Sequence, residues 1–448
     1  MKLIRLATLL IVPSLLLGAC SSFLDVKPKG VIIAETISDY DGLLNDVGVI
    51  NPFGQSICMI YTTDDVKDVS FSPQNQTAPK GNSYFWREYI NNNNDRPDVW
   101  ADFYNRIANL NVITEGVLSA SDGAEQQKKQ LYAEAAVAKA FNYFYLLSFF
   151  SPAYSKSTAE ADYGVPYVIS TDQSKATPQR PSLQQSLDDL TGNILAAIPD
   201  LPNQNINNSR FTKASAYGLL TRIYLYMGNY TDALKYADLV LRSGDATILN
   251  YNNFSTTRLP HANNSPEELL VRYCNNMSFH YSDELLSVYN LPADLRIQLL
   301  ATPTANGGYD FGGGTSYNPN RGISYAEIYL TKAECLARNG DINGALAIVN
   351  NTIRKNRMTP AGYTALTAAN KEEAITAVLE ERRRELAFKG MRWSDMKRLD
   401  KDGRMKPVMR YAADGTVLVT LTPGSTNYTF QIPLQVQAFN AGMPLNKR

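Results

Sequence analysis

Apolar residues follow a helical period through the first half of the chain. The stretch 131–150, LYAEAAVAKAFNYFYLLSFF, is rich in Ala and Leu, contains no Gly or Pro, and stops at Ser151-Pro152. This pattern predicts a long buried helix. Apolar residues at three- and four-residue steps between 100 and 113 predict a partner helix with one apolar face, so the two are expected to form a hairpin. A third helix is predicted over 182–198 by the same periodicity.

A repeated pattern predicts two similar helical hairpins further along the chain. Gly228 and Ala233 are matched, with the same internal spacing, by Gly340 and Ala345. This arrangement is typical of tetratricopeptide hairpins, because a glycine-centred turn joins two helices and small alanines let them cross closely. The alternative is two unrelated helical hairpins that match by chance. We therefore predict a mainly α fold, in which tetratricopeptide-like helical hairpins form a scaffold beside an irregular, loop-rich lobe.

Two stretches break the helical pattern, over 50–94 and about 243–320. Both mix Asn, Gly, Pro and aromatic residues in irregular order, which predicts loops and short elements. Loops on a rigid scaffold are where binding residues usually gather. The glycine cluster at 307–314 lacks the Lys and hydroxyl residue of a phosphate-binding loop, so a flexible or ligand-facing loop is the better interpretation.

The first residues predict export and a lipid anchor. Lys2 and Arg5 precede an apolar run from 6 to 17, which ends in Leu-Gly-Ala-Cys with the cysteine at Cys20. This is the pattern of a lipoprotein signal peptide, whose cysteine is acylated before cleavage. The alternatives are a plain secretory signal and a membrane-spanning helix, and the second is disfavoured because a bilayer span needs about 20 apolar residues. The predicted organisation is a lipoprotein signal peptide over 1–19 and a body over 20–448, divided into 20–210 and 211–448, with the loop-rich insertion in the second part.

Charge and rare residues exclude several classes of function. The chain has 43 basic and 43 acidic residues, so no net charge favours nucleic acid. It has two histidines, and neither lies in a zinc-binding or Ser-His motif. Zinc-dependent and serine-type hydrolysis therefore lack the residues they usually need. Besides Cys20, an odd set of cysteines, Cys58, Cys274 and Cys335, permits at most one disulfide, whose partners the sequence leaves open.

Two charged clusters could form either structural ion pairs or a functional site. The run Arg382-Arg383-Arg384 alternates with glutamates on a predicted helix, and this local balance favours an ion-paired structural helix over an anion site. Asp64, Asp65 and Asp68 supply carboxylates for glycosidase chemistry, but their separation in space cannot be known from the sequence.

Five segments follow one another in a recognisable order: the lipid cysteine followed by SSFLDVKP, the segment WADFYNRIAN from 100, RIYLYMGNYTDALKYADLVL within 211–241, AEIYLTKAECLARNGDINGALAIVN from 326 and EERRRELAFKGMRWSDMKRL from 380. In this order they resemble the SusD/RagB family, the surface lipoproteins that capture nutrients for a TonB-dependent transporter. The ending QIPLQVQAFNAGMPLNKR also resembles the closing segment of the family. The resemblance spans most of the mature chain.

This resemblance implies a lipid-anchored protein at the cell outer membrane, facing the exterior, that captures an oligosaccharide without catalysis. It implies a SusC-like TonB-dependent transporter as partner, which the helical hairpins would face, and no cofactor, with calcium left open. Family members commonly hold sugars on aromatic side chains beside polar groups, although some serve peptides or other nutrients. At 448 residues the chain is short for the family, so a loop on the ligand side is expected to be missing.

A flat aromatic ring beside amides or Arg suits a sugar, which has an apolar C–H face and a rim of hydroxyls. Trp86 lies in an Asn-rich loop context where the family places part of its ligand site, whereas Trp100 and Trp393 are expected in the core. The predicted ligand-binding residues are Trp86, Tyr84, Arg87, Asn91, Tyr273, Tyr281, Tyr309 and Tyr317. For most single tyrosines, a buried ring with a satisfied hydroxyl is the competing explanation.

The sequence leaves two other classes of function open. A helical-repeat scaffold for envelope assembly would use the same hairpins to hold a protein partner. An anchored glycoside hydrolase would need two carboxylates roughly 5–9.5 Å apart and would release products. Fold alone does not separate these classes from nutrient capture.

Overall fold

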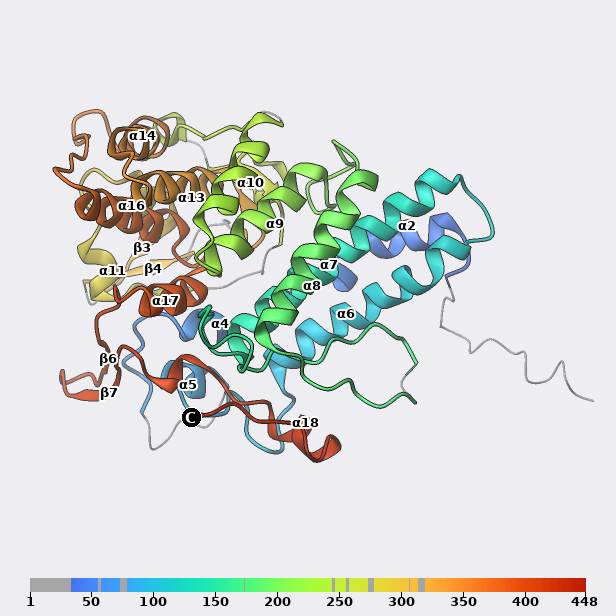
Figure 1. Ribbon diagram of the computed structural model, residues 1–448. Coiled ribbons are helices and arrows are strands. Elements are labelled where there is room, and N and C mark those ends of the chain that lie inside the picture. Colours follow the sequence, from blue (N-terminus) through green and yellow to red (C-terminus); the bar gives the residue numbers. More distant parts are fainter. Residues whose placement is uncertain are drawn as a thin grey trace, which may run out of the picture.

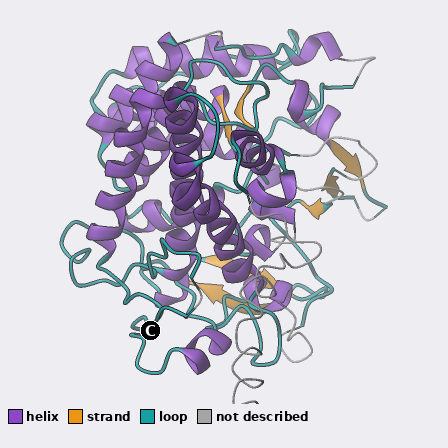
Figure 2. Ribbon diagram, turned by 90° about the vertical axis from the view of Figure 1, so that its right-hand side faces the viewer, coloured by secondary structure: helices purple, strands orange, loops and turns teal. Residues whose placement is uncertain are grey.

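Helices dominate the computed structural model (Figures 1 and 2). The structure describes residues 34–54, 58–72, 79–172, 174–243, 246–254, 258–272, 278–305, 307–312 and 319–448. Among these residues, no helix combines the length and the apolar character that crossing a membrane requires. The predicted lipid-attachment residue, Cys20, lies outside the described ranges.

The helices, in chain order, are α2 (Ile37–Asn45), α3 (Val47–Ile50), α4 (Cys58–Tyr61), α5 (Pro79–Tyr84), α6 (Asp98–Gly116), α7 (Glu125–Phe150), α8 (Leu183–Ala197), α9 (Lys213–Tyr226), α10 (Tyr230–Arg242), α11 (Asp283–Ser287), α12 (Leu295–Leu300), α13 (Tyr325–Arg338), α14 (Ile342–Ala347), the π-helix η7 (Ile348–Arg354), α15 (Lys355–Arg357), α16 (Lys371–Leu386), α17 (Arg392–Lys401) and α18 (Leu434–Phe439). Short antiparallel strands form three sheets: β1 (Glu268–Leu270) with β5 (Ile323–Ser324), β2 (Phe279–His280) with β4 (Tyr309–Phe311) and β3 (Ala301–Pro303), and β6 (Val408–Tyr411) with β7 (Val417–Leu421).

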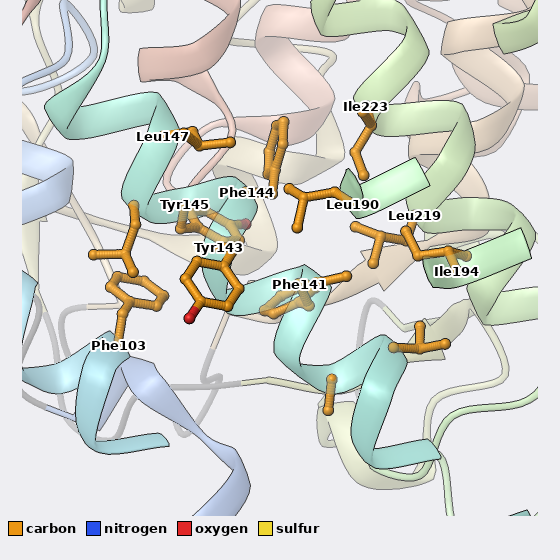
Figure 3. Packing of buried hydrophobic residues seen from close by; sticks show 14 of the residues in the cluster. Phe103, Phe141, Tyr143, Phe144, Tyr145, Leu147, Leu190, Ile194, Leu219 and Ile223 are labelled. Atoms are coloured by element: carbon orange, nitrogen blue, oxygen red, sulfur yellow. The ribbon is translucent and has the colours of Figure 1, made fainter. Parts of the chain in front are cut away.

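Helix α7 is the centre of the largest apolar core. Almost every side chain from Leu131 to its end is buried, as the uninterrupted apolar sequence predicts. Helices α6, α8 and α9 pack around it, and Figure 3 shows rings of α7 between Phe103 of α6 and the aliphatic side chains of α8 and α9. Phe103 stacks on Tyr145 with ring centres 5.5 Å apart. The predicted helices and their hairpin are therefore confirmed.

The two glycine-centred repeats are helical hairpins, as predicted. Gly228 joins α9 to α10 and Gly340 joins α13 to α14, and both have positive φ, +69° and +87°. A side chain at such a position would be strained, so glycine is required at each turn. The following residue caps the next helix in both copies, with Asn229 accepting from the Asp232 amide and Asp341 from the Gly344 amide. Helix α10 packs on α13, which stacks the two hairpins.

The irregular stretch 243–320 contributes to a second buried core. It carries β1 to β4, α11 and α12. Its apolar side chains pack with those of α4, the end of α5 and the two residues after α16 in a cluster that is unusually rich in aromatic rings. Phe388, which follows α16, lies at the centre of this aromatic cluster: its ring is 4.7 Å from Phe311, 4.9 Å from Tyr281 and 5.6 Å from Phe279. Its φ of +61° is strained for a side chain of this size, and the surrounding rings must hold it there.

Buried arginines and carboxylates join the carboxy-terminal helices. Arg296 of α12 donates to Glu381 at 2.8 Å and to Glu385 at 3.0 Å, both on α16. Arg357 of α15 donates to Glu385 at 2.9 Å and to Glu267 at 2.6 Å. The arginine-rich helix is therefore structural, as predicted, but most of its strong pairs connect it to other elements and lie in the interior.

The acidic members of this network have low pKa values. Burial alone would raise the pKa of Glu385, but the charges of Arg357, Lys389 and Arg296 outweigh burial and lower it to about 2. The carboxylate therefore stabilises the fold fully above its unfolded pKa of roughly 4.3. That contribution is lost as the pH falls through about 2, because the proton then binds the folded chain as well.

We predict that Glu385→Gln lowers the free energy of unfolding by roughly 3 kcal/mol at pH 7, because it leaves buried arginines without their partner charge. The deficit relative to wild type should shrink between pH 4.5 and pH 2, where the wild-type carboxylate also becomes neutral. Urea denaturation at pH 7 and pH 3 measures both effects. Glu380→Gln, half-exposed on the same helix, is the control and should stay within about 0.5 kcal/mol. Equal losses in both variants, or a pH-independent loss, would contradict the network's role.

Candidate functional site

An imidazole–carboxylate pair lies at the edge of the aromatic lobe. The antiparallel register of β2 and β4 places His280 opposite Asp310, and Nδ1 of His280 lies 2.8 Å from Oδ1 of Asp310. Both side chains are about one-third exposed, at 34% and 38%. Gly308 comes so close that a Cβ there would lie 2.5 Å from the imidazole, so this glycine is required by the pair.

Tyr61 lies close enough to this pair for the charge of Asp310 to act on its hydroxyl. The ring of Tyr61, at the end of α4, is 5.6 Å from the partly exposed ring of Phe71 and 6.0 Å from Phe279. The ammonium of Lys80 lies 5.9 Å from the centre of the Tyr61 ring. Burial, together with the nearby charges of Asp68 and Asp310, raises the pKa of Tyr61 to about 12, so its hydroxyl stays protonated.

We call these five residues, Tyr61, Phe71, Lys80, His280 and Asp310, the Asp310 face. The group includes two aromatic rings, a cation, a carboxylate and an imidazole. Tyr61 links them, through its ring contact with Phe71, the Lys80 ammonium over its ring and the effect of the Asp310 charge on its hydroxyl. Rings bind the C–H surface of a sugar, and the polar groups can exchange hydrogen bonds with its hydroxyls. Within the described ranges, no three His, Cys, Asp or Glu side chains gather in a way that could hold a metal ion.

The carboxylates considered for glycosidase chemistry have other partners. Arg392 donates to both oxygens of Asp64 at 2.6 and 2.7 Å, and Arg383 donates to Asp65 at 3.0 Å. Burial opposes ionisation of Asp64, but the charges of Arg383 and Arg392 outweigh it and lower the pKa. Asp68 instead accepts hydrogen bonds from Ser70. Asp64 and Asp65 therefore fix the segment that carries Tyr61 against α16 and α17.

Three of the aromatic residues predicted to bind ligand are interior residues. Tyr84 and Tyr281 belong to the buried aromatic cluster and are 1% and 2% exposed. Trp86, also 2% exposed, donates from Nε1 to the Thr62 carbonyl at 2.8 Å, and the Arg410 guanidinium lies 4.4 Å from its ring. The expectation that Trp86 is an accessible ring on a loop is therefore wrong. Its ring and its N–H group make their contacts with other residues of the protein interior.

The remaining predicted residues are placed differently. Arg87 is partly buried and donates to Asn82 at 2.9 Å, while buried Asn91 donates to the Arg96 carbonyl at 2.8 Å, so both shape the turn after α5. Tyr309 is partly exposed and packs against the aromatic cluster, next to Asp310 in β4. Tyr273 and Tyr317 lie outside the described residues. Their roles in binding stay predictions.

The sequence does not show that the five residues of the Asp310 face come together. Tyr61 and Phe71 are aromatic residues of a predicted loop, but nothing local shows that their rings meet. His280 and Asp310 lie 30 residues apart and belong to no motif. A signal was present in the short segments SFHY and GYDF, whose alternation is compatible with two paired strands. Such segments are too short to fix a register from sequence.

Comparison with known protein families decides where this architecture belongs. Residues 22–225 match a family model described as starch-binding and associating with the outer membrane, and residues 309–433 match the model of the SusD family. The chain belongs to the SusD family. The resemblance inferred from the ordered sequence segments is thus confirmed. No sequence among the curated proteins matches this SusD family member.

Solved structures of SusD-like proteins share the fold. A putative sugar-binding protein from Bacteroides vulgatus is 20% identical, with a TM-score of 0.73 over 93% of this chain and 99% of that one. A SusD superfamily protein from Bacteroides thetaiotaomicron is 18% identical, with a TM-score of 0.75 over 92% and 100% of the two chains. A laminarin-binding SusD-like protein is 18% identical, with a TM-score of 0.65 over 92% and 99%. These likenesses establish the mainly helical SusD-like fold.

We predict that Trp86→Ala lowers the free energy of unfolding by roughly 3–5 kcal/mol, because it removes a buried ring and leaves a cavity under Arg410. Trp86→Phe should cost less, since it keeps the ring but loses the hydrogen bond to Thr62. Urea denaturation measures both values. Asn93→Ala, exposed in the following loop, is the control and should change little. If Trp86→Ala kept the stability of wild type but lost ligand binding, Trp86 would instead be an accessible binding residue.

Proposed function

We propose that the protein captures an oligosaccharide at the outer surface of the outer membrane and passes it to a SusC-like TonB-dependent transporter. Membership of the SusD family supports this proposal, as does a structural relative that is named for binding laminarin. The observation that carries the proposal is the Asp310 face. Around Tyr61 it gathers the partly exposed ring of Phe71 and the ammonium of Lys80, and the charge of Asp310 links Tyr61 to the hydrogen-bonded imidazole–carboxylate pair.

The same groups favour binding over chemistry. A general acid and a general base act on a reacting bond when their pKa values suit transfer near neutral pH and both reach the substrate. Asp64 and Asp65 are occupied by Arg392 and Arg383 instead. Among the residues that the structure describes, no serine or cysteine is hydrogen-bonded to the His280–Asp310 pair. In the proposed function, the bound glycan leaves chemically unchanged.

The proposed topology assigns separate tasks to the two parts of the molecule. The stacked hairpins α9–α10 and α13–α14 would face the transporter, and the aromatic lobe would face the glycan. A lipid on Cys20 would hold the protein at the outer membrane. Export and anchoring are supported by the leader pattern before Cys20 and by the description of the matching family model.

The first functional prediction is binding without turnover. Calorimetry with laminarihexaose, maltoheptaose and cellohexaose should give saturable binding of at least one of them, and chromatography after prolonged incubation should return it intact. Phe71→Ala should weaken binding at least about tenfold, because truncation of an aromatic anchor commonly costs 2 kcal/mol or more. Ile206→Ala, which truncates a side chain 71% exposed elsewhere, is the matched control.

Release of shorter sugars by the purified protein would contradict the non-catalytic part of the proposal. Equal affinities of the Phe71→Ala variant and wild type would move the glycan away from the Asp310 face. Thermal melting of both variants must accompany the titrations, because Phe71 also contacts the rings of Tyr61 and Tyr84.

The second functional prediction concerns the anchor. Cys20→Ala removes the thiol that would be acylated, so the exported protein should move from the membrane fraction to the soluble fraction. Fractionation followed by immunoblotting measures the change in a strain that lacks the partner transporter. Ser21→Ala, next to the same cysteine, is the control and should stay membrane-bound. Retention of Cys20→Ala in the membrane would show that another feature anchors the protein.

A further inference from the structure

A second aromatic hollow lies between α6, the segment 166–177 and α18, and it is built from elements other than those of the Asp310 face. Its volume is about 410 Å³, within the roughly 300–1,000 Å³ of typical small-molecule sites. In Figure 1, α18 lies at the lower edge of the molecule, far along the chain from α6. We call this hollow the α18 groove. Its lining includes Trp100, Tyr104, Thr177, Gln435, Phe439 and Asn440.

Aromatic rings form opposite parts of the groove lining. Trp100 and Tyr104 lie one helical turn apart on α6, with ring centres 4.7 Å apart and planes inclined by 36°. The Tyr104 hydroxyl donates to the Pro166 carbonyl at 2.7 Å, and Trp100 packs edge-on against Phe150, so both rings are fixed. On α18, Phe439 is 90% exposed. A large apolar ring left in water on an ordered helix has no role in the core.

The groove is held open by hydrogen bonds at both ends of the α18 segment. Gln435 donates from Nε2 to the carbonyls of Asn92 and Asn93 at 2.6 and 2.8 Å. Beyond the helix, buried Asn446 donates to the Phe150 and Phe430 carbonyls at 2.8 and 3.0 Å. A preformed site avoids most of the ordering cost of binding.

The chemistry of the lining selects the class of ligand. None of the lining side chains carries a charge: they are aromatic, aliphatic, amide and hydroxyl groups. A phosphate, a uronic acid or a charged peptide would lose its hydration there without a compensating ion pair. A neutral sugar ring presents flat C–H faces to the aromatic rings and hydroxyls to Thr177 and Asn440.

We propose that the α18 groove is a second carbohydrate site, which takes a neutral oligosaccharide. The choice of carbohydrate rests on the proposed function, whereas the location and the neutrality of the ligand rest on the groove itself. Two sites on one chain would hold two stretches of a long glycan or two separate glycans. Simultaneous engagement of a single long chain would raise the overall affinity above that of either site.

Tryptophan fluorescence gives a readout specific to this groove. The chain has three tryptophans, and all are buried: Trp86 and Trp393 are each 2% exposed and Trp100 is 8% exposed, but Trp100 is the one among them that lines the groove. Titration of the intact protein with laminarihexaose, maltoheptaose or cellohexaose should change the emission saturably with at least one sugar. The change should persist in Phe71→Ala, where the Asp310 face is weakened. Trp100→Phe, which keeps an aromatic ring, should abolish it.

Phe439→Ala is the decisive variant, because the ring is exposed and its loss should leave the fold intact. It should weaken the fluorescence-detected binding at least about tenfold, while Ile206→Ala leaves it unchanged. If Phe439→Ala left the fluorescence titration unaltered while Phe71→Ala still weakened binding measured by calorimetry, the α18 groove would not be a sugar site. The proposed function would be unaffected. Binding of none of the sugars by either method would overturn both. A fluorescence change caused by dodecyl maltoside but by none of the three oligosaccharides would assign the groove to an apolar chain instead.

Discussion

The buried charges around α16 must all be paired, and this requirement determines how the carboxy-terminal half is assembled. A buried arginine is tolerable only when carboxylates or carbonyls surround it, so each one fixes the position of every element that supplies a partner. Arg296 and Arg357 meet at Glu385, and through them α12, α15, α16 and the start of β1 are joined. Shifting any one of these elements would leave an ion without its counter-ion in the interior. The network therefore specifies geometry more than it adds net stability.

This constraint extends to the Asp310 face. Arg392 and Arg383 hold Asp64 and Asp65, which directly follow the α4 segment that ends in Tyr61. Arg410 of β6 donates to the carbonyls of Tyr61, Thr63, Val66 and Tyr84. A segment without regular secondary structure thus has its backbone held by side chains from distant helices and strands. Loops fixed in this way can present binding groups at little entropic cost.

Local patterns predicted the parts of the fold that depend on neighbours in sequence. The apolar run of α7 and the glycine turns at Gly228 and Gly340 specify their structures within a few residues. The loop aromatics could not be assigned in the same way. Tyr281 and Trp86 have the composition of ligand-facing residues, and what buries them is Phe388 and Arg410, more than 100 residues away. Burial of a loop ring is decided by such tertiary contacts, which periodicity does not encode.

The hydrogen bonds of Asn446 bear on how the chain reaches its native state. The carbonyl of Phe150, at the end of the central helix α7, accepts from the side chain of Asn446, 296 positions later. During synthesis, α7 and its neighbours can form early, because their contacts are local. The end of this helix obtains its partner only after the segment around Asn446 has left the ribosome. The contact between the two segments therefore forms late in synthesis, after the central helix.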